Sequence, residues 1–204
     1  MHPPRSSLIL MLKEPRPGRL KTRLGRDTGL ATAAWWFRHQ TRRLIRETTD
    51  PRWRTVISLS PDRAVSQSRF YPPSIECWPQ GGGDLGARMK CALVRAMPGP
   101  VLLIGGDIPG VNRHHIAHAF GLLNSADVVF GPATDGGFWA VGIKGPRVPP
   151  GLFADVRWST GHALADTVKG LNAHKIALAD EMADADTIAD LAPRDIRATP
   201  LRIR

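Results

Sequence analysis

Short apolar runs alternate along the chain with longer segments whose apolar residues recur at helical spacing. The runs are rich in β-branched and aliphatic residues and lack a polar residue at every second position, which is typical of strands buried on both faces. The predicted strands are 7–12, 55–60, 74–78, 101–104, 126–130 and 176–179. Helices are predicted at 28–48, from the glycines at 81–83 to about 97, at 112–124 and after Gly161, with a final helical turn opening at 184–187. This order predicts an α/β fold in one domain spanning residues 1–204.

Length and cysteine content narrow the class of protein. A chain of 204 residues can bury a substantial core, and no internal repeat or interdomain linker is visible. Cys77 and Cys91 are too few for a disulfide framework and lack metal-ligand spacing, so a cytoplasmic location is expected. The apolar run Leu8–Leu12 is shorter than the core of a signal peptide, and no run approaches membrane-spanning length.

The net charge of +10 is concentrated in the first third of the chain. Residues 1–70 contain 15 Lys and Arg against 5 Asp and Glu, whereas residues 71–204 contain 13 of each. No helix-turn-helix, zinc or RNA-binding signature accompanies this charge, so nucleic acid is not an expected partner. Arg38, Arg42 and Arg46 recur every four residues and form one helical stripe. The stripe is either a solvated face or a contact for an acidic surface or substrate.

The apolar run 101–104 ends at two glycines and is followed by one carboxylate, Asp107. Open α/β sheets bind ligands at the carboxyl ends of their strands, and Gly105 and Gly106 would allow a ligand to approach the backbone. Pro109 prevents further pairing and ends the strand. Asp107 is therefore either a catalytic residue or the cap of a turn after a core strand.

A basic segment follows the first predicted strand. It contains Lys13, Lys21 and Arg23, together with two prolines and a glycine that prevent a helix at its start. Lys and Arg at the carboxyl end of a strand suit the oxygens of a phosphate. The segment is either a phosphate-binding loop or an exposed basic loop.

Two glycine-rich segments give further candidates. Gly81–Gly83 precede a helix whose amino end would attract anions or polar ligand edges, although a flexible linker explains these glycines equally well. Asp135 and the glycines that follow it lie between two apolar runs, which is a hairpin signal. Asp135 is thus either a turn residue or a second carboxylate of the same site. The histidines at 114, 115 and 118 are interpreted as a surface helix rather than a metal site.

Six segments taken in order resemble one protein family. They are KEPRPGRLKTRL, GGDLGARM, LLIGGDIPG, GPATDGGFWAVG, the WST at Trp158, and the terminal DADT. The family is DUF2064, whose bacterial members look like GT-A glycosyltransferases of the nucleotide-diphospho-sugar transferase superfamily. The resemblance spans roughly Leu8 to Leu191. The chain departs from the family pattern at two places. Gly106 stands where the family more often has Ser, and Phe138–Trp139 stand where it often has two Tyr residues. These differences affect the expected contacts with the acceptor more than those with the nucleotide.

The resemblance implies a Rossmann-like GT-A fold, with a mostly parallel twisted sheet and helices on both faces. It also implies that Asp107 and Asp186 hold Mg²⁺ or Mn²⁺, since Mg²⁺ commonly takes one or two carboxylates and completes its shell with water and phosphate. Phosphate oxygens would be bound by Lys13, Lys21 and Arg23. The base, ribose or sugar would contact Gly83, Asp84 and Arg88.

The acceptor half of the expected site is the segment that follows the Asp107 strand. Asp135 would take or orient the proton of an acceptor hydroxyl. Gly136 and Gly137 would leave space beside it, and flat apolar surfaces for the acceptor would come from Phe138, Trp139 and Trp158.

Three functions are compatible with these residues. The first is glycosyl transfer from a nucleotide-sugar to a small-molecule acceptor, and the second is nucleotidyl transfer from an NTP to a phosphorylated acceptor. A single Asp in GGDIP favours the second, whereas the KEPRPGRLKTRL segment replaces the glycine-rich loop usual in nucleotidyltransferases. The third is a non-catalytic nucleotide-binding domain, which is disfavoured because every candidate acid is present. The sequence does not indicate an oligomeric state.

Overall fold

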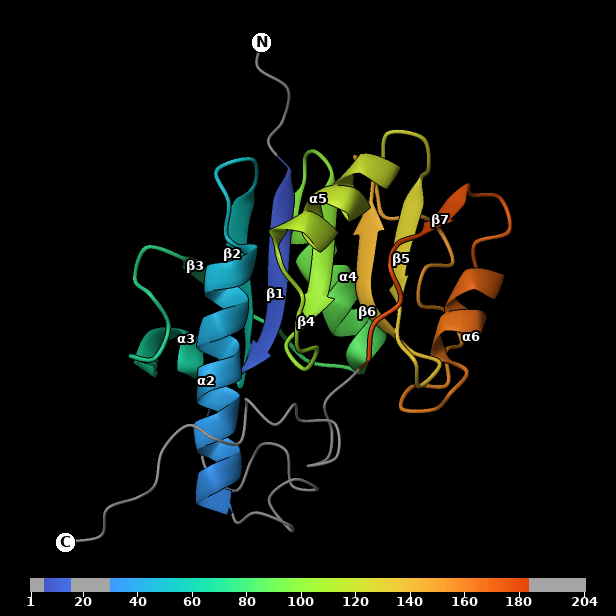
Figure 1. The fold of residues 1–204 in the computed structure, drawn as a ribbon. Coiled ribbons are helices and arrows are strands. Elements are labelled where there is room, and N and C mark those ends of the chain that lie inside the picture. The colour runs from blue at the N-terminus through green and yellow to red at the C-terminus, as the bar shows by residue number, and fades with distance from the viewer. Residues whose placement is uncertain (1–5, 16–29, 184–204) are drawn as a thin grey trace, which may run out of the picture.

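The chain folds around one seven-stranded sheet in a computed structural model that describes residues 6–15 and 30–183 (Figure 1). The strands are β1 (Ser7–Lys13), β2 (Arg54–Ser60), β3 (Glu76–Pro79), β4 (Val101–Gly105), β5 (Val128–Pro132), β6 (Phe138–Ile143) and β7 (Ile176–Leu178). Their order is β3-β2-β1-β4-β6-β5-β7. Strand β6 pairs antiparallel with both β4 and β5, and all other pairs are parallel. The expected mostly parallel α/β sheet is confirmed.

Helices cover both faces of this sheet. The described helices are α2 (Leu30–Thr48), α3 (Ala64–Gln67), α4 (Leu85–Ala96), α5 (Arg113–Leu122) and α6 (Ala163–Lys169). Helices α2 and α5 lie over one face, in front of the sheet in Figure 1, and pack with it in one apolar cluster. Helices α4 and α6 contribute to a second cluster on the opposite face. None of the helices within the described residues is long and apolar enough to cross a membrane.

The central strand β1 shows why the apolar runs contain no polar alternation. Leu8, Leu10 and Leu12 belong to the cluster under α2 and α5, while Ile9 belongs to the cluster under α4. Successive side chains of a strand point to opposite faces, so a strand buried on both sides needs an apolar residue at every position. Each of these four side chains is at most 1% exposed.

The predicted elements agree with the structure in position, with small differences at their ends. Helix α5 begins at its predicted cap, where Asn112 accepts a hydrogen bond from the His114 amide (2.9 Å). The strand predicted at 74–78 begins at Glu76 because a turn at 72–75 precedes it. The strand predicted at 126–130 is shifted to Val128–Pro132. The beginning of the helix predicted at 28 and the turn predicted at 184–187 lie outside the described residues.

The pairing of β6 with β4 was not predicted. The hairpin signal at Asp135 places β6 next to β5, and the structure confirms this antiparallel pair. Strand β6 also pairs along its other edge with β4, where Ala140 lies opposite Ile104 and Ile143 opposite Val101. As a result β6 begins at the edge of the sheet where the parallel strands end.

Candidate functional site

The carboxyl ends of β1 and β4 lie side by side, at the place where this type of sheet binds ligands. The chain crosses one face of the sheet from β1 to β2 through α2, and the other face from β3 to β4 through α4. The strand order reverses between β1 and β4, because β2 and β3 follow on one side of β1 and β4 lies on its other side. Open α/β sheets bind ligands at such a switch point. Met11 of β1 pairs with Gly105 of β4, so Lys13 and Asp107 both follow the last paired residues at this point.

The two glycines between β4 and Asp107 serve different purposes. A Cβ on Gly105 would meet no atom within 4 Å, so the backbone there borders open space. A Cβ on Gly106 would lie 2.6 Å from the Leu12 Cδ2 methyl, so the Leu12 side chain occupies the space beside this glycine. The expectation that both glycines admit a ligand is therefore wrong for Gly106. Asp107 itself is half-buried, and Ile108 after it is buried in the core.

Lys13 ends the neighbouring strand β1 and has an exposed side chain. Its backbone is fixed, because the Tyr71 hydroxyl donates a hydrogen bond to the Lys13 carbonyl oxygen (2.7 Å). Burial raises the pKa of Tyr71, so its hydroxyl remains a donor at neutral pH. The other predicted phosphate ligands, Lys21 and Arg23, lie outside the described residues.

The glycine-rich segment after β3 is attached to the ends of β1 and β2. The buried Gln80 amide nitrogen donates to the carbonyl oxygens of Leu12 and Ser58, both at 2.9 Å. The next amide, Gly81, donates to the Asp62 carboxylate (3.1 Å). Gly81 and Gly82 have no atom within 4 Å of an added Cβ. The start of the segment is thus attached to the sheet, and Gly81 and Gly82 are bordered by open space.

Three predicted ligand residues stabilise the start of α4. The Asp84 carboxylate accepts a hydrogen bond from the Ala87 amide (2.8 Å) and is the N-cap. The Arg88 guanidinium donates to the Gly83 carbonyl oxygen (3.1 Å), and Gly83 has a φ of +90°. These contacts explain the three residues structurally. Their contact with a base, ribose or sugar stays a prediction.

Asp135 forms part of the turn between β5 and β6. Its Oδ1 accepts a hydrogen bond from the Gly137 amide (2.8 Å), so it is a turn residue, as one of the two interpretations stated. Its side chain is exposed. Because β6 begins where β4 and β5 end, this turn and Asp107 lie at the same edge of the sheet. The catalytic role of either carboxylate stays a prediction.

The connection from β6 to α6 packs directly against this turn. A Cβ on Gly136 would lie 2.2 Å from the Gly161 carbonyl oxygen, and the Leu164 amide donates to the Gly136 carbonyl oxygen (3.1 Å). The expectation that Gly136 leaves space beside Asp135 is therefore wrong, because the Gly161 backbone fills that space. A Cβ on Gly137 would lie 3.0 Å from the Asp135 carboxylate itself.

The tryptophans near the turn differ in exposure. Trp158 is half-buried and packs against Phe138 and Phe153, with ring centroids 6.3 and 5.9 Å apart. It also contacts α4, since a Cβ on Gly86 would lie 2.8 Å from Trp158 Cζ2. Trp139 is 2% exposed and donates its indole N–H to the Asp180 carbonyl oxygen (2.8 Å). Trp139 is thus a core residue, and the expectation that it offers a flat surface to an acceptor is wrong.

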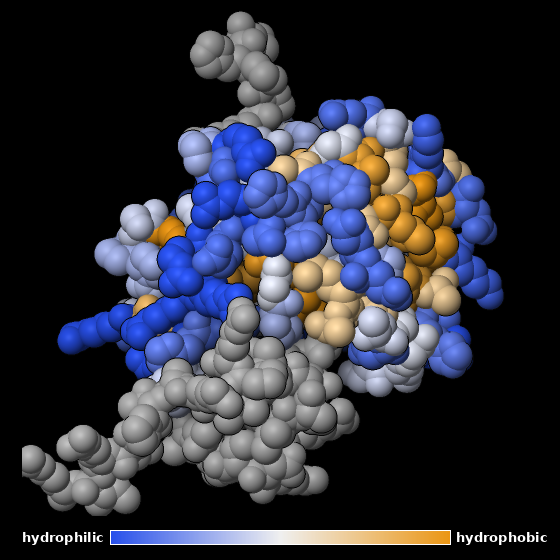
Figure 2. Space-filling model, in the orientation of Figure 1, coloured by the Kyte–Doolittle hydropathy of each residue, from blue (hydrophilic) through white to orange (hydrophobic). Residues whose placement is uncertain are grey.

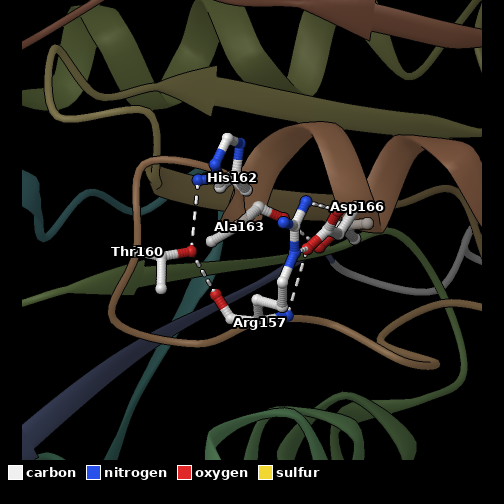
Figure 3. Close-up of polar contacts among 6 residues, drawn as sticks. Arg157, Thr160, His162, Ala163 and Asp166 are labelled. Carbon is white, nitrogen blue, oxygen red and sulfur yellow. Dashed lines mark hydrogen bonds and ion pairs between the residues drawn. The ribbon is translucent and has the colours of Figure 1, made fainter.

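A bidentate ion pair anchors the Trp158–Gly161 segment to α6 (Figure 3). Arg157 Nε and Nη2 donate to the two Asp166 carboxylate oxygens (2.9 and 2.8 Å), and the Arg157 amide donates to the same carboxylate (3.1 Å). Thr160 Oγ1 donates to the Arg157 carbonyl oxygen (2.7 Å) and accepts from the His162 amide (3.3 Å). The Arg157 guanidinium holds the pKa of the Asp166 carboxyl well below its usual range.

The remaining candidates do not form a metal site in the part of the chain that the structure describes. His115 Nδ1 accepts from the Asn112 amide (3.2 Å), and His118 Nδ1 lies 3.1 Å from an Asp180 carboxylate oxygen. Within residues 6–15 and 30–183, no three His, Cys, Asp or Glu residues are grouped to hold a metal ion. Asp186, the predicted second metal ligand, lies outside these residues.

Sequence reasoning missed Gln80, Arg157 and Asp166. A polar residue between a strand and three glycines is a signal that points to Gln80, whereas nothing in the sequence pairs Arg157 with Asp166 nine positions later. A cavity of about 560 Å³ lies elsewhere, beside β3, where Leu59, Tyr71 and Cys77 are among its lining residues. It contains none of the predicted site residues.

Comparisons with known proteins identify a family match and solved structures with a similar fold. The family model described as "Uncharacterized protein conserved in bacteria (DUF2064)" matches residues 44–160. A solved structure from Desulfovibrio desulfuricans G20, a "putative nucleotide-diphospho-sugar transferase", is 28% identical with a TM-score of 0.85, over 91% of this chain and 84% of that one. The inositol-1-phosphate CTP transferase of T. maritima shares the fold at 11% identity and a TM-score of 0.57, over 93% and 92% of the chains. The search of curated proteins found no match.

Proposed function

We propose that this chain, which belongs to the DUF2064 family, is a metal-dependent transferase that transfers a glycosyl group from a nucleotide-sugar to a small-molecule acceptor. The observation that carries the proposal is the place of Asp107, directly after β4 at the switch point of the sheet. The similarity to the Desulfovibrio protein, at 28% identity over 91% of this chain, supports a nucleotide-using transferase.

The donor nucleotide would bind at the carboxyl ends of β1 and β4. Open backbone at Gly81, Gly82 and Gly105 leaves room for a flat base and a ribose beside the strand ends. Lys13 contributes a positive charge from the end of β1, and we assign Lys21 and Arg23 to the diphosphate together with it. The hydrogen bonds from Gln80 to the ends of β1 and β2 support a donor half that is formed before the ligand arrives.

Asp107 would hold a divalent cation, Mg²⁺ or Mn²⁺. A half-buried carboxylate at a strand end, with open backbone beside it, is a donor of the type that Mg²⁺ takes from a protein when phosphate and water supply its other ligands. We assign Asp186 as the second carboxylate. The cation would neutralise the charge of the departing diphosphate.

Asp135 would serve the acceptor. Its hydrogen bond to the Gly137 amide fixes Oδ1, and the packing of Gly161 against Gly136 fixes the turn that carries it. From this position the carboxylate would accept the proton of an acceptor hydroxyl or orient that hydroxyl. The half-buried rings of Phe138 and Trp158 lie close to the same turn and offer apolar surface to the acceptor.

Nucleotidyl transfer from an NTP to a phosphorylated acceptor is the second candidate. It is favoured by the single carboxylate after β4, because Ile108 and Pro109 follow Asp107 where a second acid of a DxD motif would be expected. The fold is compatible with it, since the T. maritima CTP transferase has the same architecture. Against it stands the proline-containing segment after β1.

One experiment separates the candidates. The protein is incubated with NTPs and with GDP-, UDP-, CDP-, ADP- and dTDP-sugars, with Mg²⁺, Mn²⁺ or EDTA, and a mixture of sugars and sugar phosphates as acceptors. Glycosyl transfer releases a nucleoside diphosphate, and nucleotidyl transfer releases pyrophosphate. A parallel thermal-shift screen reports binding, because a ligand that binds only the native state raises the melting temperature. Binding with neither product would support the non-catalytic alternative, and the absence of both product and binding would overturn the proposal.

A further inference from the structure

The outer face of α2 carries a continuous row of basic and aromatic side chains. Trp35, Arg38, Arg42 and Arg46 follow one another at intervals of three or four residues, so they lie along one stripe of the helix, and Arg43 lies beside it. All five side chains are exposed, and the hydrophilic surface over the carboxyl-terminal part of α2 faces the viewer in Figure 2. We call these five residues the basic face of α2. It contains none of the residues assigned to the transferase site.

Repulsion between the positive charges of the basic face works against the stability of α2. Like charges four residues apart on a helix destabilise it, so the row from Arg38 through Arg42 to Arg46 opposes the stability of α2. Arg46 is compensated by an ion pair with Glu47 (3.1 Å). Within the described residues, Arg38 and Arg42 form no ion pair with a carboxylate.

These two arginines share one aromatic ring instead. Their guanidinium carbons lie 4.8 and 5.0 Å from the centroid of the Phe70 ring, which follows α3. The ring holds the two cations close together and offsets part of their repulsion. Each guanidinium keeps planar N–H donors for an anion, and phosphate is the anion that this fork matches best.

Trp35 distinguishes between the possible polyanionic partners. Its indole is 38% exposed at the amino-terminal end of the row of arginines. Such a ring is enriched at membrane interfaces, where one part is apolar and the other wet. A row of arginines on the outer side of a helix whose inner side is buried against the sheet also suits a broad surface more than a groove. The observations therefore favour a lipid surface over nucleic acid.

We propose that the basic face of α2 is a docking surface for an anionic membrane, with its arginines on lipid phosphates and Trp35 at the headgroup level. Each cation close to such a surface adds to the attraction, and the attraction falls within a Debye length. This binding is independent of the transferase reaction. It is peripheral and reversible, because the apolar side of α2 remains in the protein core.

The test is sedimentation of the full chain with vesicles of phosphatidylcholine alone or with 30% phosphatidylglycerol. We expect binding only to the anionic vesicles, at least tenfold weaker in 0.5 M NaCl and at least tenfold weaker for Arg38→Glu/Arg42→Glu. The matched control is Lys90→Glu/Arg95→Glu, which makes the same change in net charge on α4, on the opposite face of the sheet, and should retain most of the binding. A second variant, Arg38→Gln/Arg42→Gln, covers misfolding of the charge reversal, and thermal unfolding is measured for all variants.

Two outcomes would overturn the proposal. One is equal loss of vesicle binding in the α2 and α4 variants, which would indicate net charge alone. The other is no binding to anionic vesicles by the wild-type chain; if that chain instead binds a duplex or single-stranded DNA through the same arginines, the face belongs to a nucleic-acid site.

Discussion

The two halves of the carboxyl edge use glycine in opposite ways. At the switch point, Gly81, Gly82 and Gly105 border open space, so their missing side chains leave volume that a ligand can occupy. At the Asp135 turn, Gly136 and Gly161 touch through their backbones, and their missing side chains allow two chain segments to pack closely. We call the first the hollow half, because open space borders its glycines, and the second the filled half, because protein backbone occupies the space beside Gly136. Glycine-rich motifs therefore identify the edge of the sheet without showing which of them admits a ligand.

The largest effect on the free protein is expected for Gly136→Ala. Its φ of +83° is strained for any other residue, and the new Cβ would lie 2.2 Å from the Gly161 carbonyl oxygen. Overpacking and strain together should lower the free energy of unfolding by about 3 kcal/mol. This corresponds to a fall of about 6–12 °C in melting temperature for a chain of this size. A fall below about 2 °C would show that the backbones of Gly136 and Gly161 can separate to admit a methyl group at little cost.

Gln80→Ala tests whether Gln80 stabilises the ends of β1 and β2, which border the hollow half. The substitution removes the donor shared by the Leu12 and Ser58 carbonyl oxygens and leaves two buried acceptors without that partner. The expected loss is about 2 kcal/mol, or about 4–8 °C in melting temperature. Gln67→Ala, at an exposed position of α3, is the control and should change little. Equal effects of the two variants would remove the structural role of Gln80.

Asp166→Asn should have a smaller effect that depends on pH. Because the Asp166 pKa is depressed in the folded protein, the ion pair with Arg157 stabilises the fold above the unfolded pKa of about 4, and this contribution is lost as pH falls below it. The difference in melting temperature between wild type and variant should thus be largest at neutral pH and shrink below about pH 4. Arg157→Gln should behave similarly, and the double variant should be no less stable than either single one. A difference that is constant with pH would contradict the assignment.

Asp135→Asn should leave the fold nearly unchanged, because the amide oxygen can still accept the hydrogen bond from the Gly137 amide. Turnover should fall strongly, while nucleotide affinity stays within about threefold, which corresponds to roughly 0.7 kcal/mol. Product assays and thermal shifts with nucleotide measure the two quantities separately. If the variant loses nucleotide binding, Asp135 belongs to the donor site. If it keeps full activity, Asp135 has only a structural role in the turn.

Asp107→Asn should have the smallest effect on the free protein and a large effect on ligand binding. The neutral amide keeps the shape of the side chain but is a weaker ligand for a divalent cation. The melting temperature without ligand should change by no more than about 1 °C, whereas the metal-dependent part of the nucleotide-induced shift should disappear. A variant that retains this metal dependence would remove Asp107 from the metal site.

Most strands were predictable because a strand that is buried on both faces appears in the sequence as a run of consecutive apolar residues. Leu8 to Leu12 must be apolar at every position, since β1 lies between two helical layers, and the same holds for β4. The faces of Phe138 and Trp139 were not predictable. A shift of one residue in the register of β6 exchanges them, and the register depends on its pairing with β4, far away in the sequence.

The site was predictable to the level of the strand end. Asp107 could be placed at the carboxyl end of a strand from the apolar run before it, and open α/β sheets bind ligands at such strand ends. The position of that strand beside β1 could not be predicted, because it depends on the strand order. The filled space at Gly136 was not predictable, since it depends on a segment that returns from β6 some 25 positions later. The pairing of Arg157 with Asp166 depends in the same way on how a loop meets the helix that follows it.

The insertion of β6 between β4 and β5 sets the order in which the sheet can be completed during synthesis. Strands β1 to β4 come first along the chain and form one side of the sheet, in the order β3-β2-β1-β4. Until Phe138–Ile143 has been translated, one edge of β4 has no partner, and β5 has no place in the sheet beside it. Translation adds about 5–20 residues per second, so a nascent chain presents this apolar edge for seconds. A ribosome that pauses between β4 and β6 would prolong the interval in which that edge can capture another chain.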